Sequence, residues 1–424
     1  MRILYLADIR FPLERANGIQ TIETCHALAR RGHHVTLLVR PDTHEPARDP
    51  LAFYDLPPID TLTIARVPVR GTAILRRAQY VAAAIRRARA RSRASGHSHD
   101  FDVVFTRDLG IASALLRWPR KRRPPVVYES HGYAPVVSGL LPEMLSTAPR
   151  ASRGPLALTG LGKAGRLARR ERHVWREAEG YVTITAALAR ELQERIGDVR
   201  DVHVVPDGAR INATAAFDWI GPRGGSTDVA PAPAAGPGAP LAVYAGHLYP
   251  WKGVDVLIEA LALAPSVRGR IVGGHAAEPD LGRLQTRAQQ LGLAGRVEFT
   301  GFQPPAAVAG SLRDADVLVL PNKATMVSAR YTSPLKLFEY LAAGRPIVAS
   351  DLPALREVLR DNENARLVPP DDPRALADAL LALTRDSATA VRLARGAFET
   401  ASEYSWDRRA ARLDPILRTA TDLR

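Results

Sequence analysis

The feature that most constrains the fold is a strand, helix and strand pattern near the beginning of the chain. Residues 2–7 (RILYLA) form a short apolar run, and a second apolar run, VTLLV, occupies residues 35–39. Between the two runs, apolar residues recur at helical spacing, and a glycine suited to ending a helix follows: Ile22, Cys25, Leu28, Ala29 and then Gly32. Two buried strands joined by a helix predict a parallel α/β sheet.

This α/β pattern occurs twice, and 424 residues exceed one ordinary hydrophobic core. Further strand-like runs precede residue 210, at residues 101–106, 125–130, 180–185 and 202–206. The Gly-, Pro- and Ala-rich segment of residues 221–240 cannot bury a core. The pattern then restarts with LAVYAG, DVLIEALAL, GRIVGG, RVEFTG and DVLVLP. We therefore predict a Rossmann-like domain over 1–210, a linker over 211–240 and a second Rossmann-like domain over 241–405.

Composition narrows the class of protein. An apolar content of 46% and a charged content of 24% are typical of a globular protein, and no apolar run approaches the ~18 residues of a membrane helix. The single cysteine, Cys25, cannot form an internal disulfide, and the N-terminal MRILYLADIR resembles a strand more than a secretory signal. We expect a cytoplasmic protein. The net charge of +14 indicates an anionic partner, which leaves nucleic acid, anionic lipid and phosphorylated substrates open.

Lysine is rare in this chain, so its positions are informative. The 58 basic residues include only five lysines, namely Lys121, Lys163, Lys252, Lys323 and Lys336. In SPLKLFEY, Ser333 is a suitable N-cap and Pro334 a suitable first helical residue, so the amides of Leu335, Lys336 and Leu337 would form an anion site. Glu339 could accept hydrogen bonds from a hydroxylated ligand. The alternative is a solvated Lys336 with Glu339 in a local ion pair.

A second lysine favours the anion site. In YAGHLYPWKG, residues 244–253, a glycine turn leaves a strand and Lys252 precedes the next helix, which suits phosphate binding. The Walker A pattern is absent. Gly18 does not belong to a GxGxxG motif, so a nicotinamide dinucleotide is poorly supported.

Together these motifs resemble those of the retaining GT-B glycosyltransferases of the large family-four type. The resemblance covers nearly the whole chain, and it rests on the order of several motifs: Asn17-Gly18, RGHHVTLLV, ESHG, VVPDGAR, GHLYPWKG, SPLKLFEYLAAGRPIVASD and SWDRRAARL. It implies two Rossmann-like α/β/α domains facing across a cleft, with a final helix, residues 406–424, that returns to the first domain.

The resemblance also implies roles for individual residues. Lys252, together with the amides of Leu335 and Lys336, would bind the diphosphate of a nucleotide-sugar donor, and Glu339 would hold its ribose. His131 would contact the transferred sugar, and Gly18 would lie in the loop of the first domain that faces the phosphates or the acceptor. The other expected donor-binding positions are Gly246, His247, Gly274, Phe302, Ser333 and Pro334. No metal and no cofactor beyond the donor substrate are implied.

The chain departs from the family pattern at two positions. His247 stands where the family commonly has an arginine, five residues before the phosphate-binding lysine. Tyr331 stands where the family has the first of two glutamates spaced eight apart. That glutamate usually serves the donor sugar, so the resemblance does not identify the sugar.

Other chemically suggestive residues have structural explanations. Asp314 and Asp316 resemble a metal-binding DxD pair, but their place before a strand favours a structural role. His97 and His99 suggest an exposed polar loop. His131 shares a strand face with Glu129 by side-chain alternation, so a structural histidine is the alternative to a sugar contact.

Two basic helical segments, residues 72–93 and 160–175, read as amphipathic surface helices. In the first, we expect an apolar face of Ile74, Ala78, Val81 and Ile85. Both segments leave peripheral contact with the anionic inner face of a membrane open. Nucleic acid is disfavoured because no recognition module accompanies the charge.

The resemblance implies a metal-independent, retaining transfer of sugar from a nucleoside diphosphate-sugar to a saccharide, a lipid-linked intermediate or a metabolite. Two alternatives stay open. One is a nucleotide-sugar epimerase of the same fold, which needs no acceptor. The other is a non-catalytic nucleotide-sugar or membrane-binding relative.

Overall fold

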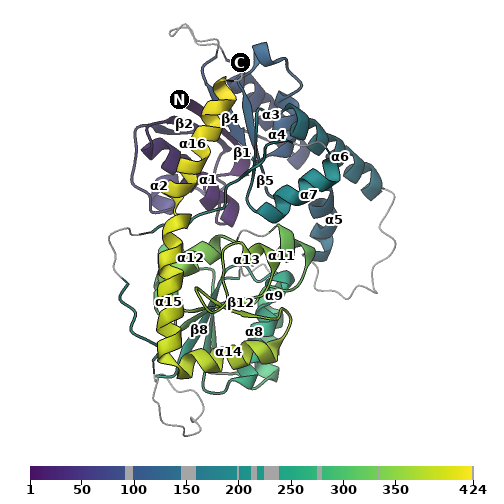
Figure 1. The fold of residues 1–424 in the computed structure, drawn as a ribbon. Helices are drawn as coiled ribbons and strands as arrows, with labels where there is room; N and C mark the ends of the chain where they lie inside the picture. The colour runs from purple at the N-terminus through teal and green to yellow at the C-terminus, as the bar shows by residue number, and fades with distance from the viewer. Residues whose placement is uncertain are drawn as a thin grey trace. The chain divides into compact units, whose positions relative to one another are not determined.

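The computed structural model describes most of the chain, and it divides the chain into two compact units. The described residues are 1–90, 99–144, 159–197, 200–211, 217–223, 238–274, 279–331 and 334–422. Unit 1 comprises Met1–Gly139, Leu156–Asp207 and Trp406–Arg424, and unit 2 comprises Leu140–Pro155 and Gly208–Ser405. Both units are α/β structures (Figure 1), as the sequence predicts.

Unit 1 is built on a seven-stranded parallel sheet in the order β3-β2-β1-β4-β5-β6-β7. Its strands are β1 (Arg2–Arg10), β2 (His34–Arg40), β3 (Leu62–Arg66), β4 (Val103–Thr106), β5 (Val126–Ser130), β6 (Gly180–Thr183) and β7 (His203–Val204). Its helices are α1 (Ala16–Arg30), α2 (Pro50–Phe53), α3 (Ala73–Ala88), α4 (Leu109–Leu115), α6 (Thr159–Glu177), α7 (Ala186–Ile196) and α16 (Trp406–Asp422), with a 3-10 turn η1 (Arg120–Arg122). Helix α5 (Ala134–Met144) begins in unit 1, and its residues from Leu140 on are assigned to unit 2. Strands β4, β5 and β6 are buried along their whole length, as expected for a parallel sheet covered on both faces.

Unit 2 is built on a six-stranded parallel sheet in the order β10-β9-β8-β11-β12-β13. Its strands are β8 (Leu241–Ala245), β9 (Arg268–Val272), β10 (Val297–Gly301), β11 (Val317–Leu320), β12 (Ile347–Ser350) and β13 (Arg366–Val368). Its helices are α8 (Val254–Leu263), α9 (Pro279–Gln290), α10 (Pro305–Arg313), α11 (Met326–Arg330), α12 (Leu335–Ala343), α13 (Pro353–Arg356), α14 (Pro373–Arg385) and α15 (Ser387–Ala401), with 3-10 turns η3 (Pro250–Lys252) and η4 (Ser402–Tyr404).

In both sheets, all strands are parallel, but the order in which the chain adds them changes sides beside the first strand of the unit. In unit 1 the reversal lies between β1 and β4, and in unit 2 it lies between β8 and β11. Open α/β sheets bind ligands outside the carboxyl ends of the strands at this reversal. The loops after β1 and β8 are therefore the places to look for a site.

The last helix, α16, is part of unit 1, where it packs against α1 and strands β4, β5 and β6. One face of α16 is buried, including Trp406, Leu413 and Leu417. Among the described residues, no helix is both long enough and apolar enough to cross a membrane.

Four details differ from the sequence-based expectations. Helix α12 begins at Leu335 with Pro334 as its N-cap, because the Leu337 amide already donates to the Pro334 carbonyl at 2.8 Å. Leu337 is therefore not a free donor for an anion, and Ser333 lies outside the described residues. His99 is 4% exposed rather than part of an exposed loop, and its carbonyl accepts a hydrogen bond from Arg2. His97 lies outside the described residues.

The prediction of which residues form the buried face of the first basic helix, α3, is wrong. The buried residues of α3 are Tyr80, Ala84 and Ala88, whereas Ile74 is 84% exposed. The Tyr80 hydroxyl explains the rotation, because it accepts from the Ala7 amide and donates to the Leu38 carbonyl inside unit 1. A polar hydroxyl with two buried partners set the orientation of this helix.

Part of the expected linker packs on unit 2. Trp219 lies against the core of this unit, and the Phe217 ring centroid lies 5.9 Å from that of Phe398. The Arg223 amide donates to the Asp316 carboxylate at 2.8 Å. Residues 212–216 and 224–237 lie outside the described part of the chain.

Candidate functional site

The loop after β8 places two lysines at the carboxyl edge of the unit 2 sheet. Lys252 ends the 3-10 turn η3, and Lys336 lies in the first turn of α12. The Lys336 side chain passes Gly246, where an added Cβ would lie 3.4 Å from the Lys336 Nζ. Glycine at 246 thus leaves space for the ammonium group. Here the structure brings together two segments that are far apart in the sequence.

Lys336 is a buried lysine whose ammonium nitrogen has no hydrogen-bond partner among the described residues. It is 8% exposed, and no described residue makes a hydrogen bond to its Nζ, which lies 3.8 Å from the centroid of the Tyr244 ring. Burial and repulsion from Lys252 lower the pKa of Lys336 well below its usual value, although Glu339 opposes this. The alternative of a solvated Lys336 is therefore wrong.

Lys252 has a similar environment. Its Nζ lies 3.6 Å from the centroid of the Trp251 ring, and burial lowers the pKa of Lys252 to about 7. By contrast, Lys323 in the same region forms an ion pair with Asp255 at 2.7 Å. Positive charge on one of these lysines disfavours positive charge on the other, and neither has a carboxylate at ion-pair distance among the described residues. The pair therefore forms a site suited to an anion with more than one negative charge.

The loop that carries Lys252 has a fixed backbone. Gly253 has a φ of 72°, and an added Cβ would lie 1.7 Å from the Pro321 carbonyl oxygen. The Lys323 amide also donates to the Trp251 carbonyl at 3.1 Å. The end of β11 thus holds the η3 turn in place, so the backbone at Lys252 is positioned before any ligand binds.

The two departures from the family pattern have defined environments. The His247 ring stacks on Tyr249 with centroids 5.1 Å apart, and its carbonyl accepts from the Tyr244 hydroxyl at 2.5 Å. Tyr331 is 5% exposed and follows α11. Tyr244, which also contacts Lys336, was missed by sequence reasoning because a tyrosine within a strand carries no motif.

The remaining expected donor-binding residues lie at neighbouring strand ends. Gly274 follows β9 and Phe302 follows β10, and the Gly273 amide joins these ends by donating to the Gly301 carbonyl at 2.9 Å. Phe302 is 49% exposed. Glu339 lies one turn after Lys336 on α12. Gly246, Gly274 and Phe302 therefore lie along one edge of the sheet, as ligand contacts would require.

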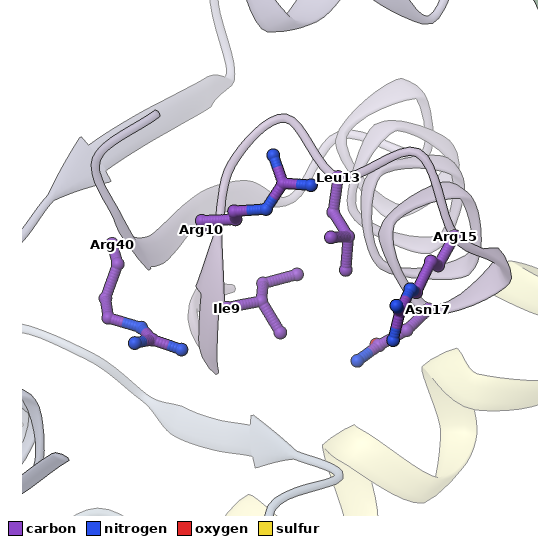
Figure 2. Close-up of a pocket in the computed structure, with 6 residues that line it drawn as sticks. All are labelled: Ile9, Arg10, Leu13, Arg15, Asn17 and Arg40. Atoms are coloured by element: carbon purple, nitrogen blue, oxygen red, sulfur yellow. The ribbon is translucent and has the colours of Figure 1, made fainter. Parts of the chain in front are cut away.

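In unit 1, the loop after β1 lines a cavity of about 520 Å³. Figure 2 shows three arginine side chains around the apolar Ile9 and Leu13, namely Arg10, Arg15 and Arg40, with Asn17 beside them. Two acids beside these side chains are each shared by two arginines: Asp8 contacts Arg40 and Arg77, whereas Glu14 contacts Arg10 and Arg48. Arg15 makes no ion pair with a described residue. The cavity therefore favours an anionic group.

Gly18 lies beside this cavity but is itself buried in the first turn of α1. An added Cβ would lie 2.2 Å from the Leu13 carbonyl oxygen and 2.4 Å from the Tyr54 hydroxyl. The same hydroxyl donates to the Leu13 carbonyl at 2.6 Å. Glycine at 18 thus allows the β1 loop to pack on α1. Sequence reasoning did not single out the cavity arginines, although they flank the Asn17-Gly18 motif.

His131 follows β5, also in unit 1, and its side chain is 20% exposed. Its Nε2 contacts the Glu129 carboxylate, which confirms that the two side chains share a strand face. Burial and the Arg107 charge lower the pKa of His131, although Glu129 opposes this. The Nε2 edge of the imidazole is bonded to the protein.

Of the DxD-like pair, Asp316 is buried in unit 2, whereas Asp314 is exposed and pairs with Arg270 at 3.3 Å. The Asp316 carboxylate accepts from the amides of Leu241 and Arg223, both at 2.8 Å, and Asp314 follows the end of α10. Among the described residues, no group of three acidic, histidine or cysteine side chains could hold a metal.

Comparison with known proteins matches both units to glycosyltransferase families. Residues 18–212 match the model described as Glycosyltransferase Family 4, and residues 239–386 match Glycosyl transferases group 1. A D-inositol 3-phosphate glycosyltransferase of Thermomonospora curvata is 30% identical over 325 residues, covering 73% of this chain and 70% of that protein. The chain belongs to the family-four type of glycosyltransferases.

Other relatives in this family match over a shorter part. The phosphatidyl-myo-inositol mannosyltransferase of Mycobacterium leprae is 31% identical over 57% of this chain. The D-inositol 3-phosphate glycosyltransferase of Xylanimonas cellulosilytica is 32% identical over 60% of this chain. The chain spans about three fifths of the length of these two relatives, 59% and 60% respectively.

Solved structures identify the GT-B fold. A sucrose-phosphate synthase from Thermosynechococcus elongatus aligns with a TM-score of 0.72, with 18% identity and full coverage of both chains. HepE from Anabaena, solved in complex with UDP-glucose, aligns with a TM-score of 0.67, with 18% identity over 98% of this chain and 99% of that one. The predicted fold and family are therefore confirmed.

Proposed function

We propose that this family member transfers a sugar from a nucleoside diphosphate-sugar to an acceptor that carries an anionic group. The proposal of a nucleotide-sugar donor rests on the pair Lys252 and Lys336. Lys252 is half-buried and Lys336 is buried, and neither has a carboxylate partner among the described residues. A diphosphate between them would relieve their repulsion. Among solved relatives of this fold, HepE binds UDP-glucose, which supports a nucleotide-sugar donor.

The transfer step follows from this placement of charge. The bond between the anomeric carbon and the diphosphate oxygen breaks, and the acceptor oxygen bonds to the same carbon. The acceptor proton passes to the departing phosphate, so atoms and charge balance without a metal or a protein nucleophile. Lys252, Lys336 and the first-turn amides of α12 would stabilise the charge that develops on the diphosphate. Attack on the face that the diphosphate leaves retains the anomeric configuration.

The cavity lined by Arg10, Arg15 and Arg40 supports an anionic acceptor. Guanidinium groups suit phosphate because they present several donors in a plane. The names of the relatives from Thermomonospora and Mycobacterium include an inositol phosphate and a phosphatidylinositol. We propose that the acceptor is a phosphate-bearing polyol or saccharide, free or linked to lipid, at the cytoplasmic face of the membrane.

Calorimetry with UDP, GDP and ADP tests the donor site. We expect one nucleotide to bind, with an affinity that falls about 10- to 100-fold in Lys252→Ala, because a charged hydrogen bond contributes about 1.5–3 kcal/mol. Glu339→Ala should also weaken binding, through the ribose. Lys323→Ala is the matched control, since Lys323 already pairs with Asp255. If no nucleotide binds to the folded protein, the donor assignment is wrong.

Product analysis with and without acceptor tests the reaction. Sugar transfer only in the presence of a phosphate-bearing acceptor supports the proposal, and Arg15→Ala should raise the KM for that acceptor while leaving nucleotide affinity unchanged. Conversion of the donor sugar without acceptor would instead identify an epimerase. Nucleotide binding without turnover on a broad acceptor panel would identify a non-catalytic relative.

A further inference from the structure

Glu129 joins strand β5 to the C-terminal helix through a buried ion pair. Its side chain is fully buried, and its Oε2 accepts a hydrogen bond from Arg409 on α16, which is 2% exposed. Arg409 also donates to the carbonyls of Val205 and Pro206, both at 2.8 Å, and to the Thr24 hydroxyl at 3.1 Å. The guanidinium is therefore held from three sides, and it fixes the position of the carboxylate.

The other carboxylate oxygen of Glu129 has partners on α1 and after β5. Its Oε1 accepts from the Gln20 side-chain amide at 2.5 Å and contacts the His131 Nε2. The Gln20 amide is oriented in turn by Arg107, whose Nη1 donates to the Gln20 Oε1 at 2.6 Å. Glu129 thus has defined partners on both oxygens, and His131 is one of them.

These contacts determine which nitrogen of His131 carries the proton. Burial raises the pKa of Glu129, but Arg409 and His131 outweigh burial and hold this pKa well below its usual value. An ionised carboxylate only accepts hydrogen bonds, so the neighbouring Nε2 must be the donor. In the neutral imidazole the Nδ1 is then the acceptor.

We propose that Arg409 is a positioning residue: it fixes Glu129, and Glu129 holds His131 in the Nε2–H tautomer, so that the Nδ1 accepts a hydrogen bond from a substrate hydroxyl. The role in turnover rests on the proposed function and on the contact with the transferred sugar that the family resemblance implies for His131. The opposite tautomer would present an N–H donor to the same hydroxyl, which would then have to accept the hydrogen bond instead of donating it. A residue of the last helix therefore tunes the chemistry of a residue after β5.

Nuclear magnetic resonance of protein labelled with ¹⁵N-histidine tests the tautomer without any substrate. The His131 signals are assigned by their loss in His131→Asn. We expect the wild-type protein at pH 7 to show a protonated Nε2 and a bare Nδ1. In Arg409→Lys, which keeps the charge but loses the planar set of donors, we expect a mixture of tautomers. Arg409→Met should lose the preference, and Arg408→Met, an exposed neighbour on α16, should keep the wild-type signals.

Kinetics with the active donor and acceptor provide the second readout. We expect kcat to fall about 10-fold in Arg409→Lys and about 10- to 100-fold in Arg409→Met, the range typical of losing a group that orients a functional histidine. The KM for the donor should change little, because Lys252 and Lys336 remain. The pH profile should also shift, since Glu129, Arg107 and Asp207 are the charged groups that act on His131.

The two readouts separate the outcomes. A wild-type His131 that carries its proton on Nδ1 overturns the proposal, even if Arg409→Met does not fold. So does a folded Arg409→Lys protein with the wild-type tautomer and the wild-type kcat, because a purely structural role would only lower the melting temperature. If the wild-type protein shows no transfer while the tautomer still depends on Arg409, the proposed function fails and the positioning role stands.

Discussion

At the scale of residues, the central feature is a buried lysine that is placed against an aromatic ring instead of a carboxylate. Contact of the Lys336 ammonium with the face of Tyr244 stabilises it by about 0.5–2 kcal/mol, which is less than the usual cost of burying a charge. The remaining cost persists until an anion arrives. Lys252 also opposes the charging of Lys336 in the free protein, and a bound diphosphate would favour the charged form of both lysines.

This arrangement predicts that nucleotide binding takes up protons. The pKa of free Lys252 is about 7, and a bound anion raises it. Well below pH 7, Lys252 is already charged in the free protein, so its contribution to nucleotide affinity is complete. This contribution declines as the pH rises from 7 through the pKa of Lys252 in the bound state. Calorimetry at pH 8 in buffers of different ionisation enthalpy should show uptake of about 0.9 proton at Lys252.

The control for this prediction is Lys252→Arg. Arginine stays charged at pH 8, so proton uptake should decrease while some nucleotide affinity is kept. Lys336 should account for the uptake that remains. A binding heat that is the same in every buffer for the wild-type protein would contradict the assignment of the lysines to the phosphate site.

At the scale of elements, the η3 turn depends on glycine at 253. Gly253→Ala should destabilise unit 2 by about 2–4 kcal/mol, because it adds a left-handed backbone penalty to a collision with the Pro321 carbonyl. Nucleotide affinity should also fall, since the turn that carries Lys252 must move. Thermal unfolding and calorimetry measure the two effects.

Gly292→Ala provides the matched comparison within the same unit. Gly292 has a φ of 69°, close to that of Gly253, but an added Cβ would meet no atom within 4 Å. We expect a loss of only about 1–2 kcal/mol and unchanged nucleotide affinity. Equal effects of the two substitutions would show that the Pro321 contact does not position the turn.

From the hydrogen bonds of the Asp316 carboxylate we predict that this residue contributes to the stability of unit 2 and does not bind a metal. Asp316→Ala leaves the buried amide of Leu241 and the amide of Arg223 without their acceptor, so unit 2 should lose about 2–4 kcal/mol of stability. Addition of EDTA should leave nucleotide binding and turnover of the wild-type protein unchanged. Loss of activity on chelation, with recovery on adding a divalent cation, would instead support a metal role for this pair.

The sequence predicted the elements whose signal is local. Buried parallel strands are continuous apolar runs, so β1, β2, β8 and β11 were found within a few residues of their observed bounds. The short strands β3 and β13 have weak apolar patterns and were not predicted. The predicted orientation of α3 was wrong, because apolar periodicity does not reveal that the Tyr80 hydroxyl has two buried backbone partners.

The candidate site was predictable only as far as its motifs. Lys252, Lys336 and His131 belong to recognisable segments, and their rarity or spacing drew attention to them. Arg409 and Gln20 act through contacts with residues far away in the sequence: 280 positions separate Arg409 from Glu129, and 109 separate Gln20 from Glu129. No single sequence carries a signal for such a pairing, because Glu129 alone reads as part of a strand and Arg409 alone as part of an ordinary helix.

At the scale of the whole molecule, the excess of positive charge invites a test of membrane contact. The beginning of α3 exposes Ile74 and Leu75, at 84% and 50%, beside the exposed Arg76. An apolar pair next to arginines suits the surface of an anionic bilayer. We predict binding to phosphatidylglycerol vesicles that weakens with salt, since exposed charges are screened beyond about 8 Å at physiological ionic strength.

Sedimentation with vesicles checks this prediction. The double substitution of Ile74 and Leu75 to glutamate should reduce binding at least about tenfold, because each apolar side chain contributes about 1.5–3 kcal/mol when buried. Glutamate at the exposed Leu263 of α8 is the control and should have little effect. Equal binding to neutral and anionic vesicles would exclude an electrostatic contribution.

The buried pair of Glu129 and Arg409 also has a consequence for biosynthesis. A ribosome that adds about 5–20 residues per second makes Arg409 roughly 15–55 s after Glu129. Until then the carboxylate lacks this counter-charge, so unit 1 cannot reach its final form before α16 has been made. A shortened product without α16 would lack this ion pair.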